Sequence, residues 1–201
     1  FFAVLKKGLP FVLLKAALTL DGKVAAPSGD ARWISSEASR RVAHAYRQWL
    51  PAVMVGVGTV LKDDPALTVR EPDFRPFPLM VEPPPLRDPL KVVLDTEART
   101  PPTARLFRKG PRGEPARVLV FVGEGAPRAR VSALEEAGAR VVALPREGGR
   151  VDPERALAFL LEEGVGLWEW RYPFPLEGEA VVVLDLETTG LAPGLDEVIE
   201  V

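Results

Sequence analysis

The sequence predicts an α/β fold with a largely parallel central sheet and flanking helices, and three observations support this prediction. Short apolar runs rich in valine and leucine recur along the chain. Amphipathic segments with a helical period separate several of these runs, and glycine, proline and aspartate mark their ends. Strands that alternate with helices at this spacing are typical of a parallel sheet with covered faces.

The first elements follow from local signals. The apolar run at residues 10–20 predicts a buried strand, which ends at an Asp-Gly turn. Residues 23–35 contain the turn-forming sequence Pro-Ser-Gly-Asp and predict a loop. A helix is expected over residues 36–50, capped by Ser35 or Ser36, and it must stop before the proline that follows.

The middle of the chain repeats this pattern. Four further strands are expected at residues 52–58, 90–95, 116–123 and 140–145. Residues 59–61 begin a short turn after the first of these, and residues 71–89 predict a long surface loop rich in proline and charge. Helices are expected at residues 128–139 and 152–164, the second with Asp152 as its N-cap and Pro153 at its first position.

The regular pattern of strand-like and helix-like segments ends after Gly164. We therefore place a domain boundary near residues 164–168 and divide the chain into residues 1–164 and 165–201. The later part contains the strand-like run VVVLDL. Asp185 and Glu187, two positions apart, would point to the same face of a strand, as the first metal ligands of a two-metal phosphodiesterase do.

Composition excludes several classes of function. The net charge is −2 and the pI is about 5.6, which gives no electrostatic footprint for nucleic acid or a membrane surface. No apolar run is long enough to span a bilayer. With no cysteine and 1 histidine, a zinc site of the usual kinds is excluded, and a reducing, cytoplasmic compartment is expected.

Three stretches together resemble a known family. They are LKAALTLDGKVAAPSGDARWIS, AYRQWLPAVMVGVGTVLKDDPALTVR and LKVVLDT. Residues 9–163 are similar to the reductase half of the bifunctional riboflavin-biosynthesis deaminase/reductase. The resemblance implies a dihydrofolate-reductase-like fold, here incomplete at its C-terminus. It also implies NADPH-dependent reduction of 5-amino-6-(5-phosphoribosylamino)uracil to its ribitylamino product, and a homodimer in the intact family.

The resemblance also implies substrate contacts from Arg47, Leu67 and Arg70. The two arginines suit a sugar phosphate, because a guanidinium is permanently charged and binds phosphate in a bidentate manner. Ala31 stands where family members often have serine or threonine, so one hydroxyl contact to the substrate is lost here.

A nicotinamide cofactor needs an aromatic or apolar contact, small residues and donors for its phosphates. There is no Rossmann G-x-G-x-x-G after a strand, so the assignment depends on the resemblance. It implies NADPH contacts from Ala17, Val24, Ala25, Ala26, Pro27, Trp33, Thr59, Asp63 and Thr96.

Reduction of an opened ribosylamine needs a proton for its nitrogen. Asp63 is the candidate donor by its place in the motif, and Lys15 is a second candidate, for polarising or orienting the sugar. Asp64 precedes a proline, and we expect it to fix a turn. We further expect Trp33, Arg47, Thr59, Asp63 and Arg70 to converge around one cleft.

The family's last strand and its glycine-rich turn are not found after residue 163, so weak NADPH binding and little turnover are expected. Instead, DLETTGL and the residues after it resemble the opening of the epsilon-type proofreading exonuclease of DNA polymerase III, which implies metal-binding roles for Asp185 and Glu187. The sequence starts with phenylalanine rather than methionine. We interpret the chain as a fragment joined from two reading frames. The alternatives are therefore an exonuclease fragment and an inactive sugar-phosphate-binding module.

Overall fold

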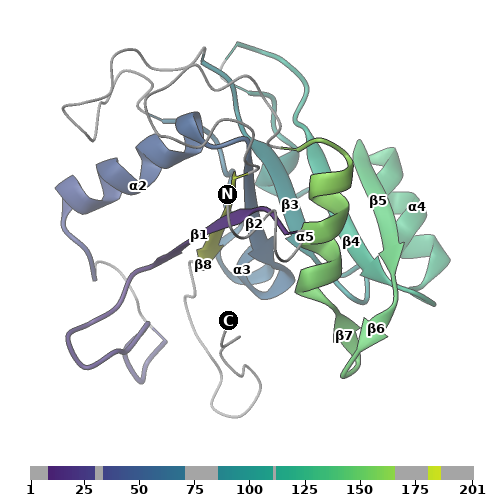
Figure 1. Ribbon diagram of the computed structural model, residues 1–201, viewed down its shortest axis with the longest axis horizontal. Coiled ribbons are helices and arrows are strands. Elements are labelled where there is room, and N and C mark those ends of the chain that lie inside the picture. Colours follow the sequence, from purple (N-terminus) through teal and green to yellow (C-terminus); the bar gives the residue numbers. More distant parts are fainter. Residues whose placement is uncertain (1–8, 30–33, 71–85, 111, 166–180, 187–201) are drawn as a thin grey trace.

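The computed structural model describes residues 9–29, 34–70, 86–110, 112–165 and the backbone of residues 181–186 (Figure 1). Its strands are β1 (Phe11–Ala16), β2 (Ala52–Gly56), β3 (Leu90–Leu94), β4 (Val118–Gly123), β5 (Ala139–Leu144), β6 (Arg146–Glu147), β7 (Arg150–Val151) and β8 (Val181–Leu186). Its helices are α2 (Glu37–Trp49), α3 (Val57–Asp63), α4 (Arg128–Glu136), α5 (Pro153–Glu162) and the 3₁₀ turn η1 (Arg105–Phe107). No helix in these described ranges is long and apolar enough to cross a bilayer.

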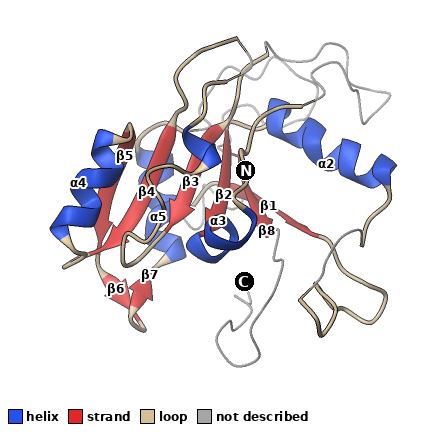
Figure 2. Ribbon diagram, turned by 180° about the vertical axis from the view of Figure 1, so that it is seen from behind, coloured by secondary structure: helices blue, strands red, loops and turns tan. Residues whose placement is uncertain are grey.

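A six-stranded sheet organises the molecule, in the order β1-β8-β2-β3-β4-β5, and every pairing in it is parallel. The α/β prediction with a parallel sheet is thus confirmed. Helix α5 covers one face, and α3 and α4 cover the other (Figures 1 and 2). Strands β6 and β7 form a separate antiparallel hairpin.

The central strands are buried on both faces, as a parallel sheet requires. In β4, Val118, Val120 and Val122 pack toward α3 and α4, whereas Leu119 and Phe121 pack toward α5. Residues of β2 and β3 alternate in the same way. This period of two divides the core into two clusters, one on each side of the sheet.

Two helices begin at the predicted caps. The Ser36 hydroxyl accepts the N–H of Ser39 at 3.2 Å at the start of α2. The Asp152 carboxylate accepts the N–H of Glu154 at 2.8 Å at the start of α5, with proline in the first helical position. Each cap satisfies a backbone donor that the helix itself leaves open.

The structure differs from the sequence prediction after β2. The residues predicted as a strand end and a short turn form α3 instead. Glycine, valine and threonine have low helix propensity, so this segment did not read as a helix. Val57 and Val60 are buried in the core, and this packing outweighs the local preference.

Strand β8 is the second difference. The sequence led us to expect a sheet that lacks its last strands, but residues 181–186 lie between β1 and β2. In this register Val181 is opposite Phe11 and Asp185 is opposite Lys15. Backbone pairing requires no particular side-chain sequence, so a valine-rich run can occupy this position in the sheet.

Candidate functional site

The carboxyl ends of the parallel strands gather several of the sequence-predicted residues at one edge of the sheet. Ala17 follows β1, Thr59 lies in the helix that follows β2, and Thr96 is the second residue after β3. In open α/β sheets, ligands bind outside this edge, because loops and helix N-termini meet there. These three candidate cofactor contacts therefore share the edge that ligands favour.

The turn after β3 is fixed by a buried carboxyl group. Asp95 has no exposed surface, and its Oδ2 accepts both the backbone N–H of Thr100 at 2.6 Å and the Thr100 hydroxyl at 2.7 Å. Asp95 Oδ1 is buried and has no hydrogen-bond partner among the described residues. This residue was not singled out from the sequence, although an aspartate directly after a buried strand is a readable signal.

Thr96 is held by the hairpin that packs on this edge. Its Oγ1 accepts the backbone N–H of Val151 at 3.0 Å, which leaves the hydroxyl proton available for donation to a ligand. Gly123, at the end of β4, allows this close packing. A Cβ atom there would lie 2.6 Å from Arg146 Nε and 2.9 Å from Thr96 Cγ2.

Arg146 holds the loop after β3, which carries Thr96, against the end of β4. Its guanidinium forms an ion pair with Glu97, and its Nε donates to the carbonyl oxygen of Glu124 at 3.0 Å. The loop that carries Thr96 is thus connected to β4 and to β6 at once. The result is a rigid, preorganised position for the Thr96 hydroxyl.

The loop after β1 approaches α3. A Cβ atom on Gly29 would lie 3.6 Å from Lys62 Nζ, so this loop and α3 are neighbours. Of the predicted cofactor contacts in the loop, Val24 and Ala25 are partly buried, whereas Ala26 and Pro27 are exposed. Trp33 and Ala31 lie outside the described residues.

Asp63 and Asp64 have different surroundings at the end of α3. Asp63, the candidate proton donor, is partly buried. Asp64 caps the helix in the left-handed region, with φ of 42°, and its Oδ1 accepts the N–H of Arg105 at 2.7 Å. Asp64 is therefore a structural residue that anchors the following loop, as the sequence suggested.

The candidate substrate residues lie toward the opposite end of the strands. Arg47 is in the last turn of α2, and only 5% of its surface is exposed. Leu67 is 1% exposed and packs in the core with a φ of 52°. Arg70 is exposed and follows Val69, whose N–H donates to Asp88 just before β3 begins.

The expected convergence of Trp33, Arg47, Thr59, Asp63 and Arg70 on one cleft stays a prediction, because Trp33 lies outside the described residues. Helix α2 carries the chain back to the amino ends of the strands before β2 begins. A five-residue strand such as β2 then spans about 16 Å before the chain reaches Thr59. Arg47 in α2 consequently precedes the amino end of β2, whereas Thr59 in α3 follows its carboxyl end.

Lys15 and the predicted metal ligands belong to the strands at the other side of the sheet. Lys15 is partly buried in β1, and Asp185 occupies the neighbouring register position in β8. Glu187 lies outside the described residues. Within the described ranges, no group of three or more His, Cys, Asp or Glu side chains could hold a metal ion.

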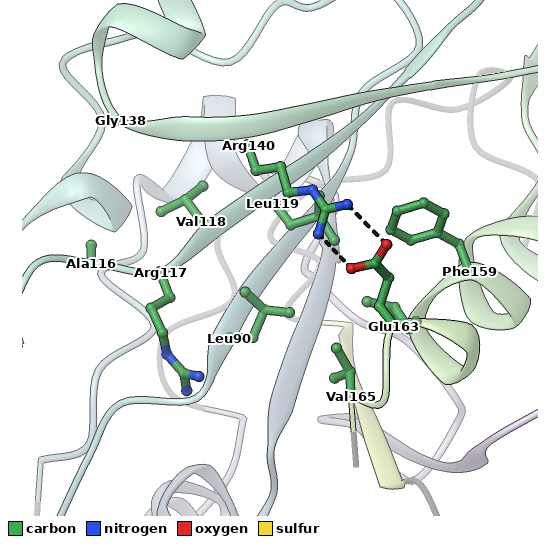
Figure 3. Close-up of a pocket in the computed structure, with 11 residues that line it drawn as sticks. Leu90, Ala116, Arg117, Val118, Leu119, Gly138, Arg140, Phe159, Glu163 and Val165 are labelled. Carbon is green, nitrogen blue, oxygen red and sulfur yellow. Dashed lines mark hydrogen bonds and ion pairs between the residues drawn. The ribbon is translucent and has the colours of Figure 1, made fainter. Parts of the chain in front are cut away.

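A cavity in the described residues lies elsewhere (Figure 3). It has a volume of about 370 Å³ and lies at the amino ends of β3, β4 and β5. Figure 3 shows the Arg140 guanidinium and the Glu163 carboxylate facing each other beside the Phe159 ring, with Nη1–Oε2 and Nη2–Oε1 distances of 2.7 and 3.0 Å. None of the sequence-predicted site residues line this cavity.

The comparisons of this chain with known proteins agree on one protein family. The chain matches the family model described as the RibD C-terminal domain over residues 10–167. The riboflavin biosynthesis protein RibD of Bacillus amyloliquefaciens is 36% identical over 165 residues, which cover 82% of this chain and 40% of that protein. The chain therefore spans less than half the length of that relative.

A second relative is closer in size. The 2,5-diamino-6-ribosylamino-4(3H)-pyrimidinone 5′-phosphate reductase of Methanothermobacter thermautotrophicus is 39% identical over 189 residues, which cover 94% of this chain and 75% of that protein. Because this alignment covers so much of the chain, it extends beyond residue 164.

Solved structures agree. The crystal structure of a diaminohydroxyphosphoribosylaminopyrimidine deaminase/5-amino-6-(5-phosphoribosylamino)uracil reductase from Thermotoga maritima is 31% identical. Its TM-score is 0.56, and the match covers 92% of this chain and 41% of that one. Acinetobacter baumannii RibD, at 24% identity and a TM-score of 0.59, supports the fold alone.

Proposed function

The chain belongs to the RibD C-terminal domain family, and from this premise we propose that it is an NADPH-dependent reductase of riboflavin biosynthesis. Its substrate would be 5-amino-6-(5-phosphoribosylamino)uracil, and its product the corresponding ribitylamino compound. The observation that carries the proposal is the gathering of Ala17, Thr59 and Thr96 at the carboxyl edge of one parallel sheet. We also propose a cytoplasmic location and a homodimer, by analogy with the family.

The residues at this edge fit a nicotinamide cofactor. Thr96 keeps a hydroxyl proton for a phosphate or ribose oxygen, and the Asp95–Thr100 turn and Arg146 hold it in place. When bound, the cofactor supplies a hydride to C1 of the opened ribosylamine. The proposed NADPH contacts are Ala17, Val24, Ala25, Ala26, Pro27, Trp33, Thr59, Asp63 and Thr96.

The chain's own residues would complete the reaction. Reduction at C1 leaves the adjoining nitrogen in need of a proton, and we assign its donation to Asp63. Lys15, near the carboxyl end of β1, would orient the sugar hydroxyls as a donor. Arg47, Leu67 and Arg70 would bind the substrate, the two arginines through its phosphate.

A fluorescence titration with NADPH tests the proposal. We expect the wild-type chain to bind NADPH, and Thr96→Val to weaken this binding about 5- to 10-fold, because one hydrogen bond is lost. Trp33→Ala is expected to weaken it as well. Thr103→Val, at an exposed position in the same loop, serves as the matched control and should leave binding unchanged.

Two other results would redirect the assignment. If the chain binds ribose 5-phosphate but not NADPH, it is the inactive sugar-phosphate-binding module. If it binds neither ligand, the reductase proposal fails. Turnover with the phosphoribosylaminouracil substrate then separates an active reductase from a chain that only binds.

A separate proposal concerns residues 165–201, whose sequence we infer to be similar to the start of an epsilon-type exonuclease. The support is the DLETTGL motif, in which Asp185 and Glu187 would bind metal. A pair of carboxylates holds a divalent ion weakly and provides no base to activate water. We therefore expect no 3′–5′ cleavage of single-stranded DNA with Mg²⁺ or Mn²⁺. Cleavage that disappears in Asp185→Ala would instead assign a working nuclease to this segment.

A further inference from the structure

A fully buried lysine lies near the amino end of β3. Lys91, in β3 beside Val92 and Val93, has no exposed surface. Its Nζ donates to the carbonyl oxygen of Leu106 at 3.0 Å and lies 3.5 Å from Asp88 Oδ2. Burial lowers the pKa of Lys91, and the nearby Asp88 carboxylate opposes this shift. A buried ammonium is costly, so its retention in a strand calls for a specific purpose.

The partner of Lys91 is connected to the loop that carries the candidate substrate residues. Asp88 is 6% exposed, and its second oxygen, Oδ1, accepts the backbone N–H of Val69 at 2.8 Å. We call residues 64–70 the substrate loop, because it contains Leu67 and Arg70. Asp88 thus joins the charge of Lys91 directly to the backbone of this loop.

The other end of the substrate loop is tied to the same place. Asp64 Oδ1 accepts the N–H of Arg105, and the next residue, Leu106, provides the carbonyl that binds Lys91 Nζ. Both ends of the substrate loop are therefore anchored to η1. The Asp64 end contacts η1 directly, and the Val69 end is connected to it through Asp88 and Lys91.

These contacts hold the substrate loop in a strained backbone conformation. Asp64 and Leu67 have φ values of 42° and 52°, in the left-handed region that residues other than glycine rarely adopt. Each such residue costs about 1 kcal/mol or more and persists only where its surroundings enforce it. The Leu67 side chain is also fixed in the core, so the loop has one conformation determined at several points.

Arg47 belongs to the same electrostatic group. Burial is the main cause of the lowered pKa of Lys91, and the positive charge of Arg47 lowers it further. Arg117 Nη2 also donates to the carbonyl oxygen of Asp88 at 3.1 Å. The Asp88 carboxylate is the nearest negative charge to the buried Lys91 ammonium, and Glu114 also favours the charged form of this lysine.

We propose that Asp88 and Lys91 are positioning residues for a phosphorylated sugar, because they fix the substrate loop without touching the ligand. The role of the loop in this statement rests on the proposed function. The chemical class of ligand is a phosphomonoester of a pentose, which the cations of Arg47 and Arg70 would recognise.

The test compares three variants, using ribose 5-phosphate and NADPH as probes. Asp88→Ala removes the acceptor for Val69 and the partner of Lys91. Asp88→Asn combined with Lys91→Met removes both charges but keeps a side-chain acceptor for Val69. Asp152→Ala is the matched control, because it also removes a carboxylate that accepts one backbone N–H, at the start of α5 and away from the substrate loop.

We expect Asp88→Ala to weaken ribose 5-phosphate binding about 10-fold, the factor that a lost positioning contact of ordinary strength would give, with NADPH binding changed less than about 2-fold. The double variant should recover most of the ribose 5-phosphate affinity. Asp152→Ala should lose stability toward urea and leave both affinities unchanged. Hydrogen exchange at the Val69 amide should accelerate in Asp88→Ala and remain slow in the double variant.

Three results would overturn the proposal. One is equal weakening of both ligands in Asp88→Ala, and another is the same ribose 5-phosphate loss in Asp152→Ala. The third is unchanged Val69 exchange in Asp88→Ala. If the wild-type chain binds neither probe, the proposed function has failed, and Val69 exchange alone then decides whether Asp88 and Lys91 hold the loop.

Discussion

Replacing Arg47 by methionine is expected to weaken binding of ribose 5-phosphate about 100-fold. A charge-assisted bidentate contact to phosphate contributes about 2–3 kcal/mol, and each 1.4 kcal/mol changes an affinity tenfold. Methionine retains much of the buried volume of Arg47, which is only 5% exposed, so the change removes charge more than packing. Isothermal titration calorimetry with ribose 5-phosphate measures the loss directly.

Two controls separate recognition from folding. Arg47→Lys keeps the charge but loses the planar, two-point contact, so we expect an intermediate loss of affinity. Arg41→Met removes an arginine from the exposed surface of the same helix and should leave the affinity unchanged. If Arg47→Met binds ribose 5-phosphate as tightly as wild type, Arg47 has a structural role only.

Replacing Asp95 by alanine is expected to lower the free energy of unfolding by about 3 kcal/mol, because two buried hydrogen bonds to a carboxyl group are lost together. The Thr100 N–H and hydroxyl would then lack their acceptor. Since this turn presents Thr96, NADPH binding should weaken as well. Urea denaturation at an unchanged m value measures the first effect, and a fluorescence titration measures the second.

The conservative variants give the matched comparison. Asp95→Asn keeps an acceptor in the same place and should lose less than half as much stability. Thr100→Val removes only the hydroxyl donor and should lie between wild type and Asp95→Ala. A stability of Asp95→Ala equal to wild type would mean that the Asp95–Thr100 contacts contribute nothing to the turn.

The sequence was most informative where the signals are local. Ser36 and Asp152 are caps that a reader can recognise from neighbouring residues, and both cap their helices in the structure. The valine-rich runs of β2, β3 and β4 are long and apolar enough to be read as buried strands. Local signals of this kind need no knowledge of the three-dimensional arrangement.

The errors came from interactions between distant segments. Helix α3 depends on the burial of Val57 and Val60, which the weak helix propensity of their neighbours conceals. The β6–β7 hairpin is an exception, because it was missed although Gly148 and Gly149 between two short strands are a local hairpin signal. The buried Lys91 could not be predicted, because its partners Asp88 and Leu106 come together only in the folded chain.

In the candidate site too, the sequence predicts some features, whereas others depend on the folded chain. Motif resemblance placed Ala17, Thr59 and Thr96 in one group, and the parallel sheet brings them to one edge. It also grouped Arg47 with Thr59, but α2 ends just before β2 begins, so Arg47 precedes the amino end of β2 and Thr59 follows its carboxyl end. A linear motif carries no information about which end of a strand a residue will occupy.

The position of β8 has a consequence for how the protein forms during synthesis. Among the described strands, β1 pairs with β8 alone, so β1 is joined to the sheet through a strand that comes much later in the sequence. A ribosome would release β1 long before β8 exists. During that interval β2, β3, β4 and β5 can assemble in sequence, while the loop carrying Ala17 waits unpaired. We therefore expect the carboxyl edge next to Ala17 to be completed only after β8 has been synthesised.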